Sequence, residues 1–139
     1  MKHIFEQKVF YSDTDAYGVV WHGAYLRWLE MGRVYWCEEI GYKLQDLKEQ
    51  NIVLPVTNIN VRYKRSAKLD DILSIHTYVS AFNGTSATFV QEIYANGSNK
   101  PSLTAEVEVV AVTTDEGRLY RKMPDILAEV FEKELLCQV

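Results

Sequence analysis

A continuous helical stretch, residues 22–40, is apolar around most of its circumference and constrains the fold more than any other feature. It contains no proline and has glycine only at Gly23 and Gly32, while Gly41 stands where a helix C-cap is expected. At 1.5 Å per residue it forms about five turns. Its apolar residues are Tyr25, Leu26, Trp28, Leu29, Met31, Val34, Tyr35 and Trp36. Such a helix must be enclosed on more than one side, because no single stripe would bury them all.

The remaining sequence predicts the strands that enclose this helix. After Pro55 apolar and polar residues alternate, which indicates a half-buried strand with Ile59, Val61 and Tyr63 on one face and Asn58, Asn60, Arg62 and Lys64 on the other. Further strands are expected at residues 4–11, 72–82, 85–95 and 103–113. The pair Asn83-Gly84 is a strong hairpin signal between two of them.

The order of the elements defines an α+β fold. A short amphipathic helix follows Pro124, so the chain reads strand, long helix, four strands, short helix. We expect one domain over residues 1–139, in which a curved antiparallel sheet of about five strands wraps the long helix. Such a sheet has free edges and the sequence shows no device that blunts them, so at least a dimer is expected.

Composition narrows the classes of function. The net charge is -4 and no long run of one sign occurs, which disfavours general binding of nucleic acid. No segment approaches the ~20 apolar residues of a membrane span, and charge appears within the first six residues, so a cytosolic protein is expected. Cys37 and Cys137 are interpreted as free thiols, and His3 and His76 have no partners at metal-ligand spacing.

The segment 9–25 carries the chemistry. It places Asp13 and Asp15 in a turn, followed by Gly18 and by the helix start at His22. A helix start presents unpaired backbone N–H groups and the positive end of the helix dipole, which can bind the oxyanion formed when a carbonyl is attacked. A nearby carboxylate can attack the carbonyl or deprotonate water, so the segment favours acyl transfer. The alternative interpretation is that both aspartates only cap and shape the turn.

The pattern Thr14-Asp15, two residues, Gly18-Val19-Val20, one residue, His22, two residues, Tyr25 resembles the active-site signature of the 4-hydroxybenzoyl-CoA thioesterase family. It is also similar to that of the bacterial Tol-Pal-associated acyl-CoA thioesterases. The likeness continues through residues 25–33 and 61–71, so it covers nearly the whole chain. Lys8 departs from the signature, which tends to have Gln or Arg there, at a position remote from the chemistry.

This resemblance implies a hotdog fold, homodimers with a continuous sheet that often form homotetramers, and active sites at the dimer interface. It also implies hydrolysis of acyl-CoA without metal or cofactor. Asp15 matches the catalytic aspartate, as nucleophile or as general base, and the backbone N–H at His22 matches the group that polarises the thioester carbonyl. The His22 side chain lines the site and favours aliphatic or broad substrates. The substrate-binding candidates are Tyr17, Gly18, Val19, Trp21 and Tyr25, together with Arg62, Lys64 and Arg65. The basic residues that could meet the phosphates of coenzyme A are Arg62, Lys64, Arg65, Lys68, Lys100, Arg118, Arg121 and Lys122.

Other functions stay open at this level. The substrate could instead be an acyl-carrier-protein thioester, or the chain could bind acyl-CoA without turnover. A hotdog dehydratase is disfavoured because its His-containing motifs are missing, and Gly84-Thr85-Ser86 does not form the nucleophile elbow of a Ser-His-Asp esterase. Glu30 and Arg33 lie one helical turn apart and could pair on the surface or be semi-buried. The acyl group, whether aroyl, short aliphatic or polyketide-type, is not determined.

Overall fold

Five antiparallel strands form one sheet in the computed structural model, which describes residues 1–136. The strands are β1 (His3–Lys8), β2 (Val56–Tyr63), β3 (Ile72–Phe82), β4 (Ser86–Ala95) and β5 (Leu103–Val110). Their order across the sheet is β1-β3-β4-β5-β2, so β1 and β2 are its two edges. The predicted α+β fold with a five-stranded antiparallel sheet is confirmed. Cys137 lies outside the described residues.

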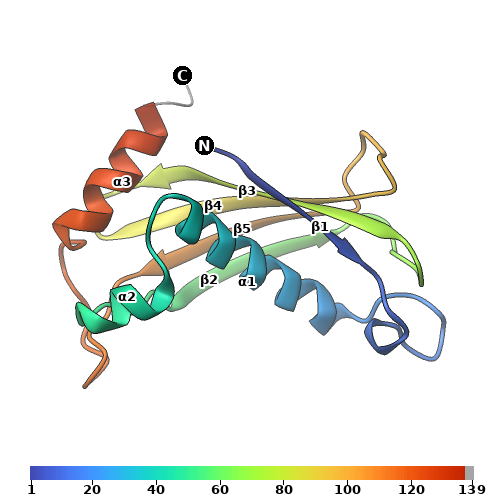
Figure 1. Ribbon diagram of the computed structural model, residues 1–139, viewed down its shortest axis with the longest axis horizontal. Coiled ribbons are helices and arrows are strands. Elements are labelled where there is room, and N and C mark those ends of the chain that lie inside the picture. Colours follow the sequence, from blue (N-terminus) through green and yellow to red (C-terminus); the bar gives the residue numbers. More distant parts are fainter. Residues whose placement is uncertain (137–139) are drawn as a thin grey trace.

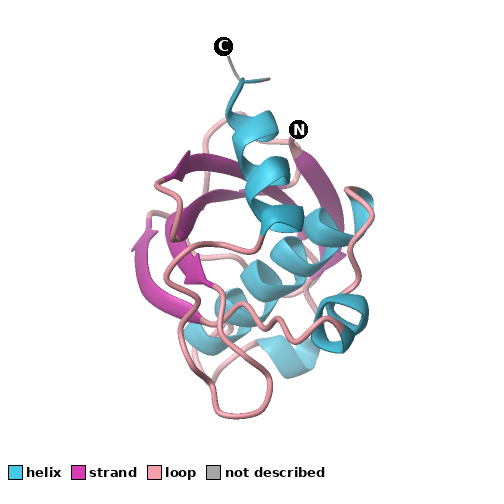
Figure 2. Ribbon diagram, turned by 90° about the vertical axis from the view of Figure 1, so that its left-hand side faces the viewer, coloured by secondary structure: helices cyan, strands magenta, loops and turns pink. Residues whose placement is uncertain are grey.

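The long helix α1 (His22–Glu39) lies on one face of the sheet, and the sheet curves round it (Figures 1 and 2). Trp28, Leu29 and Trp36 on α1 are at most 1% exposed and pack toward the inward-facing residues of the strands. The Trp36 ring lies edge-on to Phe89 of β4, 5.1 Å away, and stacks on Phe131 of α3 (Asp125–Leu136) at 6.0 Å. The short C-terminal helix is thus part of the core, as its apolar face predicts.

Gly32 allows α1 to approach the sheet closely. A Cβ atom at this position would lie 2.6 Å from Thr77 Oγ1 and 2.8 Å from Gln91 Nε2. Both side chains are fully buried, and Gln91 Nε2 donates to Thr77 Oγ1 at 2.9 Å and to the carbonyl of Leu29 at 2.8 Å. The amide of Gln91 therefore joins the sheet to the helix at the point of closest approach.

Two local predictions differ from the structure. β1 ends at Lys8 and residues Tyr11–Asp13 form a 3-10 turn, because the Asp13 carboxylate accepts from Phe10 N and draws the chain out of the strand. Tyr11, expected on the apolar face of the first strand, is 82% exposed. The helix α2 (Leu44–Glu49) was not predicted, since a helix of six residues has too few turns to show a periodic pattern.

The strand β2 is more exposed than its alternating sequence predicts. Ile59 is 41% and Tyr63 45% exposed, although both lie on the face of the sheet that carries α1. The reason is the position of β2 at the edge of the sheet, where β5 is its single neighbouring strand. Leu26 of α1 is likewise 43% exposed. In the single chain, therefore, α1 is not enclosed as completely as we expected, and one edge of the sheet stays free.

Candidate active site

Asp13 anchors the loop between β1 and α1. Its side chain is buried, with Oδ2 accepting from Phe10 N at 3.0 Å and Oδ1 paired with the guanidinium of Arg27 on α1. Its backbone carbonyl accepts from Trp21 N at 3.0 Å, just before the helix. Asp13 therefore has a structural role in fixing the loop to the helix, which is the capping interpretation rather than the catalytic one.

Asp15 lies in a tight turn that presents its carboxylate to solvent. Asp15 O accepts from Gly18 N at 3.0 Å, and Asp15 N donates to Val19 O at 2.9 Å. Asp15 Oδ1 accepts from Tyr17 N at 2.8 Å and from Val19 N at 3.4 Å, whereas Oδ2 has no donor among residues 1–136. Gly18 has φ of 78°, a conformation that favours glycine. The turn thus orients the carboxylate through one oxygen and leaves the other free.

The start of α1 offers free backbone donors at the end of the same loop. Trp21 is the N-cap residue and no side chain caps the helix. Within the described part of the chain, the N–H groups of His22 and Gly23 have no hydrogen-bond acceptor. The Trp21 ring lies against Gly23, where a Cβ atom would overlap it. These N–H groups at the positive end of the helix dipole are suited to bind a developing oxyanion.

A neighbouring loop fixes the Asp15 turn from the other side. Val20 N donates to Ala67 O at 2.9 Å, and Val19 forms an isolated bridge with Lys68. Ala67 N in turn donates to the hydroxyl of Tyr25 at 2.9 Å. Tyr25 is 2% exposed, and burial is the main cause that raises the pKa of its hydroxyl. Tyr25 thus packs in the core of this chain, and its contact with substrate stays a prediction.

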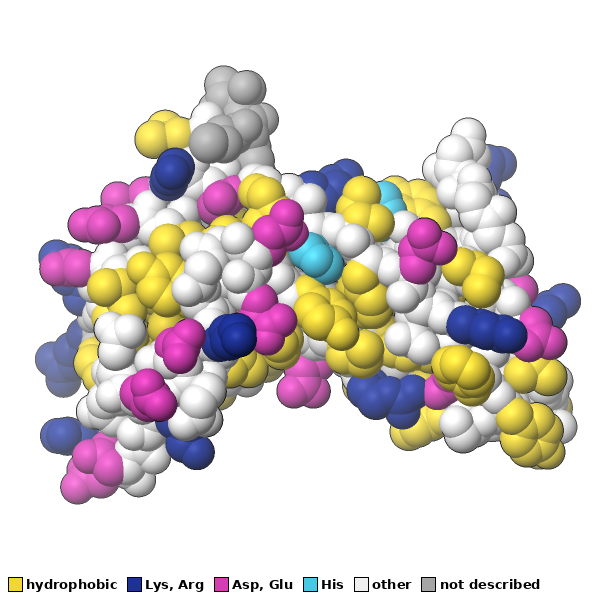
Figure 3. Space-filling model, in the orientation of Figure 1, with side chains coloured by type: hydrophobic (Ala, Val, Ile, Leu, Met, Phe, Trp, Pro, Cys, Tyr) yellow, Lys and Arg dark blue, Asp and Glu magenta, His cyan; other side chains and the backbone are white. Residues whose placement is uncertain are grey.

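Exposed aromatic side chains surround the Asp15 turn. Tyr17 is 91% and Trp21 46% exposed, and Phe10 and Tyr11 from the same loop are exposed as well. Figure 3 shows hydrophobic side chains gathered at this end of the molecule. The His22 ring lies 4.7 Å from the ring of Tyr63, at the end of β2. Sequence reasoning did not assign Tyr63 to the site, because only the folded chain brings it there. Phe10 and Tyr11 were not assigned either, because they were expected in the first strand.

The basic residues predicted to bind coenzyme A on β2 and just after it separate into two groups. Lys64, Arg65 and Lys68 are exposed on the connection between β2 and β3, which runs beside the Asp15 turn. Arg62 lies elsewhere, in a shallow hollow with Asn60, Glu92 and Glu106 on the opposite face of the sheet. The alternation of side chains along β2 explains this, since the adjacent Tyr63 faces α1. Arg62 therefore lies apart from the other three in the single chain. The further candidates lie on other connections, Lys100 between β4 and β5 and Arg118, Arg121 and Lys122 between β5 and α3. The contact of each with coenzyme A stays a prediction.

Other kinds of site find no support in the described residues. No group of three or more His, Cys, Asp or Glu side chains among residues 1–136 is arranged to hold a metal ion. Cys37 is buried on α1 as a free thiol, and burial raises its pKa to about 12. None of the described helices is long and apolar enough to cross a membrane.

The sequence matches the family model of the thioesterase-like superfamily over residues 9–133. The chain belongs to this family. It is 33% identical over 127 residues to an acyl-CoA thioester hydrolase, YbgC, from Escherichia coli, covering 91% of this chain and 92% of that protein. An acyl-CoA thioesterase, YbgC, from Haemophilus influenzae is 35% identical over 107 residues, which cover 76% and 79% of the two chains.

Solved structures share the fold over nearly the whole chain. The DHNA-CoA thioesterase from Staphylococcus aureus superimposes with a TM-score of 0.87 at 26% identity, covering 99% of this chain and 93% of that one. A complex of 4-hydroxybenzoyl CoA thioesterase with 4-hydroxybenzoyl CoA gives a TM-score of 0.84 at 23% identity, over 93% and 97% of the chains. The predicted hotdog fold and thioesterase class are confirmed.

Proposed function

We propose that this protein hydrolyses acyl-CoA thioesters to the free acid and coenzyme A, with Asp15 as the catalytic carboxylate. One observation carries the proposal. A single loop holds the Asp15 carboxylate and ends at the helix start, and among residues 1–136 one carboxylate oxygen and the N–H groups of His22 and Gly23 have no partner. Hydrolysis of a thioester needs those two functions, a group that attacks or activates water and an oxyanion site. Named relatives that act on acyl-CoA support the substrate class.

The reaction follows two possible routes from this geometry. As a general base, Asp15 takes a proton from water while the water oxygen attacks the thioester carbon. As a nucleophile, Asp15 attacks that carbon itself and forms an anhydride that water then cleaves. In both routes the carbonyl oxygen becomes an oxyanion held by the N–H groups at His22 and Gly23. When this oxyanion collapses, the C–S bond breaks and the sulfur of coenzyme A leaves as a thiolate that is then protonated. The collapse gives the free acid directly in the first route, and in the second it gives the anhydride that water cleaves afterwards.

Residues around the turn have binding roles in this proposal. Tyr17 and Trp21 flank the entrance, and the backbone of Gly18 and Val19 shapes the turn that holds Asp15. We expect Lys64, Arg65 and Lys68 to meet the phosphates of coenzyme A; their exposure on the loop beside this turn supports this. The His22 side chain lines the site against Tyr63, and its backbone does the polarising.

We further propose that the functional unit is a homodimer in which β2 edges of two copies pair. The exposed edge and the half-exposed Ile59 and Tyr63 support this, because pairing would cover apolar side chains that a single chain leaves open. The substitution Ile59→Lys tests it. Light scattering should give half the wild-type mass at equal concentration, and an unchanged mass would contradict pairing through this edge. A further pairing into tetramers and a cytosolic location stay predictions from the sequence.

Free coenzyme A released from a panel of aliphatic and aromatic acyl-CoAs tests the function. Asp15→Asn should lose at least about 100-fold in kcat, the usual scale for a general base, and keep the wild-type circular dichroism spectrum. Asp46→Asn, an exposed aspartate on α2, is the matched control and should leave turnover unchanged. If no CoA ester is turned over by the wild type, the proposal fails in favour of a carrier-protein thioester or of binding without turnover.

A further inference from the structure

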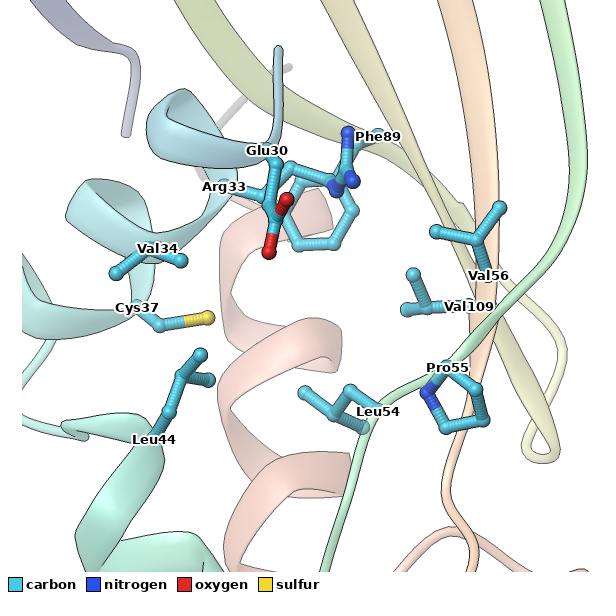
Figure 4. Close-up of a pocket in the computed structure, with 10 residues that line it drawn as sticks. All are labelled: Glu30, Arg33, Val34, Cys37, Leu44, Leu54, Pro55, Val56, Phe89 and Val109. Atoms are coloured by element: carbon cyan, nitrogen blue, oxygen red, sulfur yellow. The ribbon is translucent and has the colours of Figure 1, made fainter. Parts of the chain in front are cut away.

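A second cavity lies along the later turns of α1, away from the Asp15 turn. It has a volume of about 310 Å³ and is bounded by α1, by Leu44 on α2, by the start of β2 and by Phe89 of β4. Figure 4 shows an apolar end with Leu44, Leu54 and Pro55, and a polar end where Glu30 and Arg33 project from α1. The volume is at the lower end of the range of small-molecule sites. The cavity is thus suited to a small, largely apolar group.

Arg33 is held at the polar end by a buried amide. Its Nη1 donates to Gln91 Oε1 at 2.9 Å, and Gln91 itself is fixed by its two bonds to Thr77 and Leu29. Within residues 1–136 no carboxylate lies within 4 Å of the guanidinium, and burial is the main cause that lowers its pKa. A guanidinium has five N–H donors, and Gln91 accepts from one of them. The remaining donors are free for an acceptor.

The cavity is remote from Asp15 of the same chain. Arg33 is eleven residues beyond His22, which is ~16 Å along the helix axis at 1.5 Å per residue. The cavity and the Asp15 turn of two different copies can lie closer together, because both regions border the edge strand β2. Its last residue, Tyr63, contacts His22, and its first residue, Val56, lines the cavity. Antiparallel pairing of two β2 edges sets the start of one strand beside the end of the other. Such a pair would bring the cavity of one copy toward the Asp15 turn of the second copy.

We propose that this cavity holds the acyl group of the thioester and that Arg33 is a specificity-determining residue, donating a hydrogen bond to an oxygen of the acyl group. The inference rests on the proposed function and on pairing through β2. The preferred substrates carry an uncharged oxygen, as an oxo or hydroxy group. A carboxylate is disfavoured, because Glu30 places a negative charge at the same end of the cavity.

The test compares acyl-CoAs matched in length, with and without an oxo or hydroxy group, as the ratio of their kcat/KM values. A hydrogen bond to a charged donor corresponds to roughly a 10- to 100-fold preference of the wild type for at least one oxygen-bearing member of the pairs. Arg33→Met should bring that ratio near one, because kcat/KM for the oxygen-bearing member falls more than kcat/KM for the plain member. Arg118→Met, an exposed arginine paired with Glu116, is the matched control and should keep the wild-type ratio.

A second variant keeps the inference testable if Arg33→Met does not fold. Leu44 is 45% exposed at the apolar end, so Leu44→Phe fills the cavity without burying a new polar group. It should lower kcat/KM for longer acyl groups about tenfold relative to kcat/KM for acetyl-CoA. An unchanged ratio in Arg33→Met, or unchanged chain-length dependence in Leu44→Phe, overturns the inference while hydrolysis itself stands. Loss of all CoA release by the wild type overturns the proposed function instead.

Discussion

Gly32 is the point where the packing of α1 on the sheet can be tested most sharply. The substitution Gly32→Ala places a Cβ atom 2.6 Å from Thr77 Oγ1 and 2.8 Å from Gln91 Nε2. Neither side chain moves freely, because both are fully buried and bonded to each other, and Gln91 is also bonded to Leu29 and Arg33. The helix must therefore shift away from the sheet, or the Gln91 amide must give up a hydrogen bond.

The change in the free energy of unfolding caused by Gly32→Ala is the sum of opposing contributions. Overpacking a tight site costs about 1–3 kcal/mol, and a lost buried hydrogen bond costs about 1 kcal/mol. Alanine is favoured over glycine within a helix by about 1 kcal/mol. We expect the free energy of unfolding to fall by about 1–3 kcal/mol, measured by urea denaturation, with a fall in Tm of roughly 5–10 °C.

A double-mutant cycle with Thr77→Ala identifies the cause. This change removes the atom nearest to the new Cβ, so the cost of Gly32→Ala should be smaller by about 1 kcal/mol in that background. A Gly32→Ala protein as stable as the wild type would refute the close approach of helix and sheet. An equal cost in both backgrounds would refute the contact with Thr77 as its source.

Three further predictions follow from individual residues. Asp13→Ala leaves Phe10 N and Arg27 without their acceptor, so the free energy of unfolding should fall by about 1–3 kcal/mol in urea titrations; an unchanged midpoint would contradict the anchoring role. Burial raises the pKa of Cys37 from 9.0 to about 12, so its contribution to stability is complete below pH 9 and is lost as the pH rises toward 12, with a slope of about 1.4 kcal/mol per unit. Unfolding at pH 8 and pH 10 should show this loss for the wild type and a smaller one for Cys37→Ala, whereas equal losses would rule the thiol out as the source. His22→Ala keeps its backbone N–H, so kcat for acyl-CoA should fall less than about tenfold; a loss as large as that of Asp15→Asn would assign the chemistry to the ring.

Local sequence patterns predicted most of the fold. The side-chain alternation and the turn signal at Asn83-Gly84 defined strands β3 to β5, and in the structure Asn83 Oδ1 accepts from Thr85 N and Ser86 N at that turn. The continuous helical stretch defined α1 to within one residue at its end. The six-residue helix α2 was not predicted, because it is too short to show a periodic pattern of apolar residues.

The site was predicted in part, and long-range contacts account for the rest. The turn around Asp15 and the helix start at His22 follow one another in sequence, so their proximity could be inferred. The pairing of Asp13 with Arg27, the bond between Arg33 and Gln91 and the loop at Ala67 all join segments that only folding brings together. The sequence left open whether Glu30 and Arg33 pair on the surface or are semi-buried, and in the structure Arg33 donates to the buried amide of Gln91.

The exposure of β2 shows a different limit. Its alternation correctly assigned Tyr63 and Arg62 to opposite faces, but alternation does not report what covers a face. Ile59 is 41% exposed because β2 is an edge strand of the single chain. The sequence of β2 has the pattern of a buried face, whereas the structure leaves that face half exposed at the edge of the sheet. This difference leads us to propose a homodimer paired through β2.

The most direct test of the account separates binding from chemistry at Asp15. Asp15→Asn should bind an intact acyl-CoA in isothermal titration calorimetry, because the helix start and the basic loop are unchanged, and should release coenzyme A from it at least about 100-fold more slowly than the wild type. Release at the wild-type rate by this variant would contradict the assignment of Asp15 as the catalytic carboxylate.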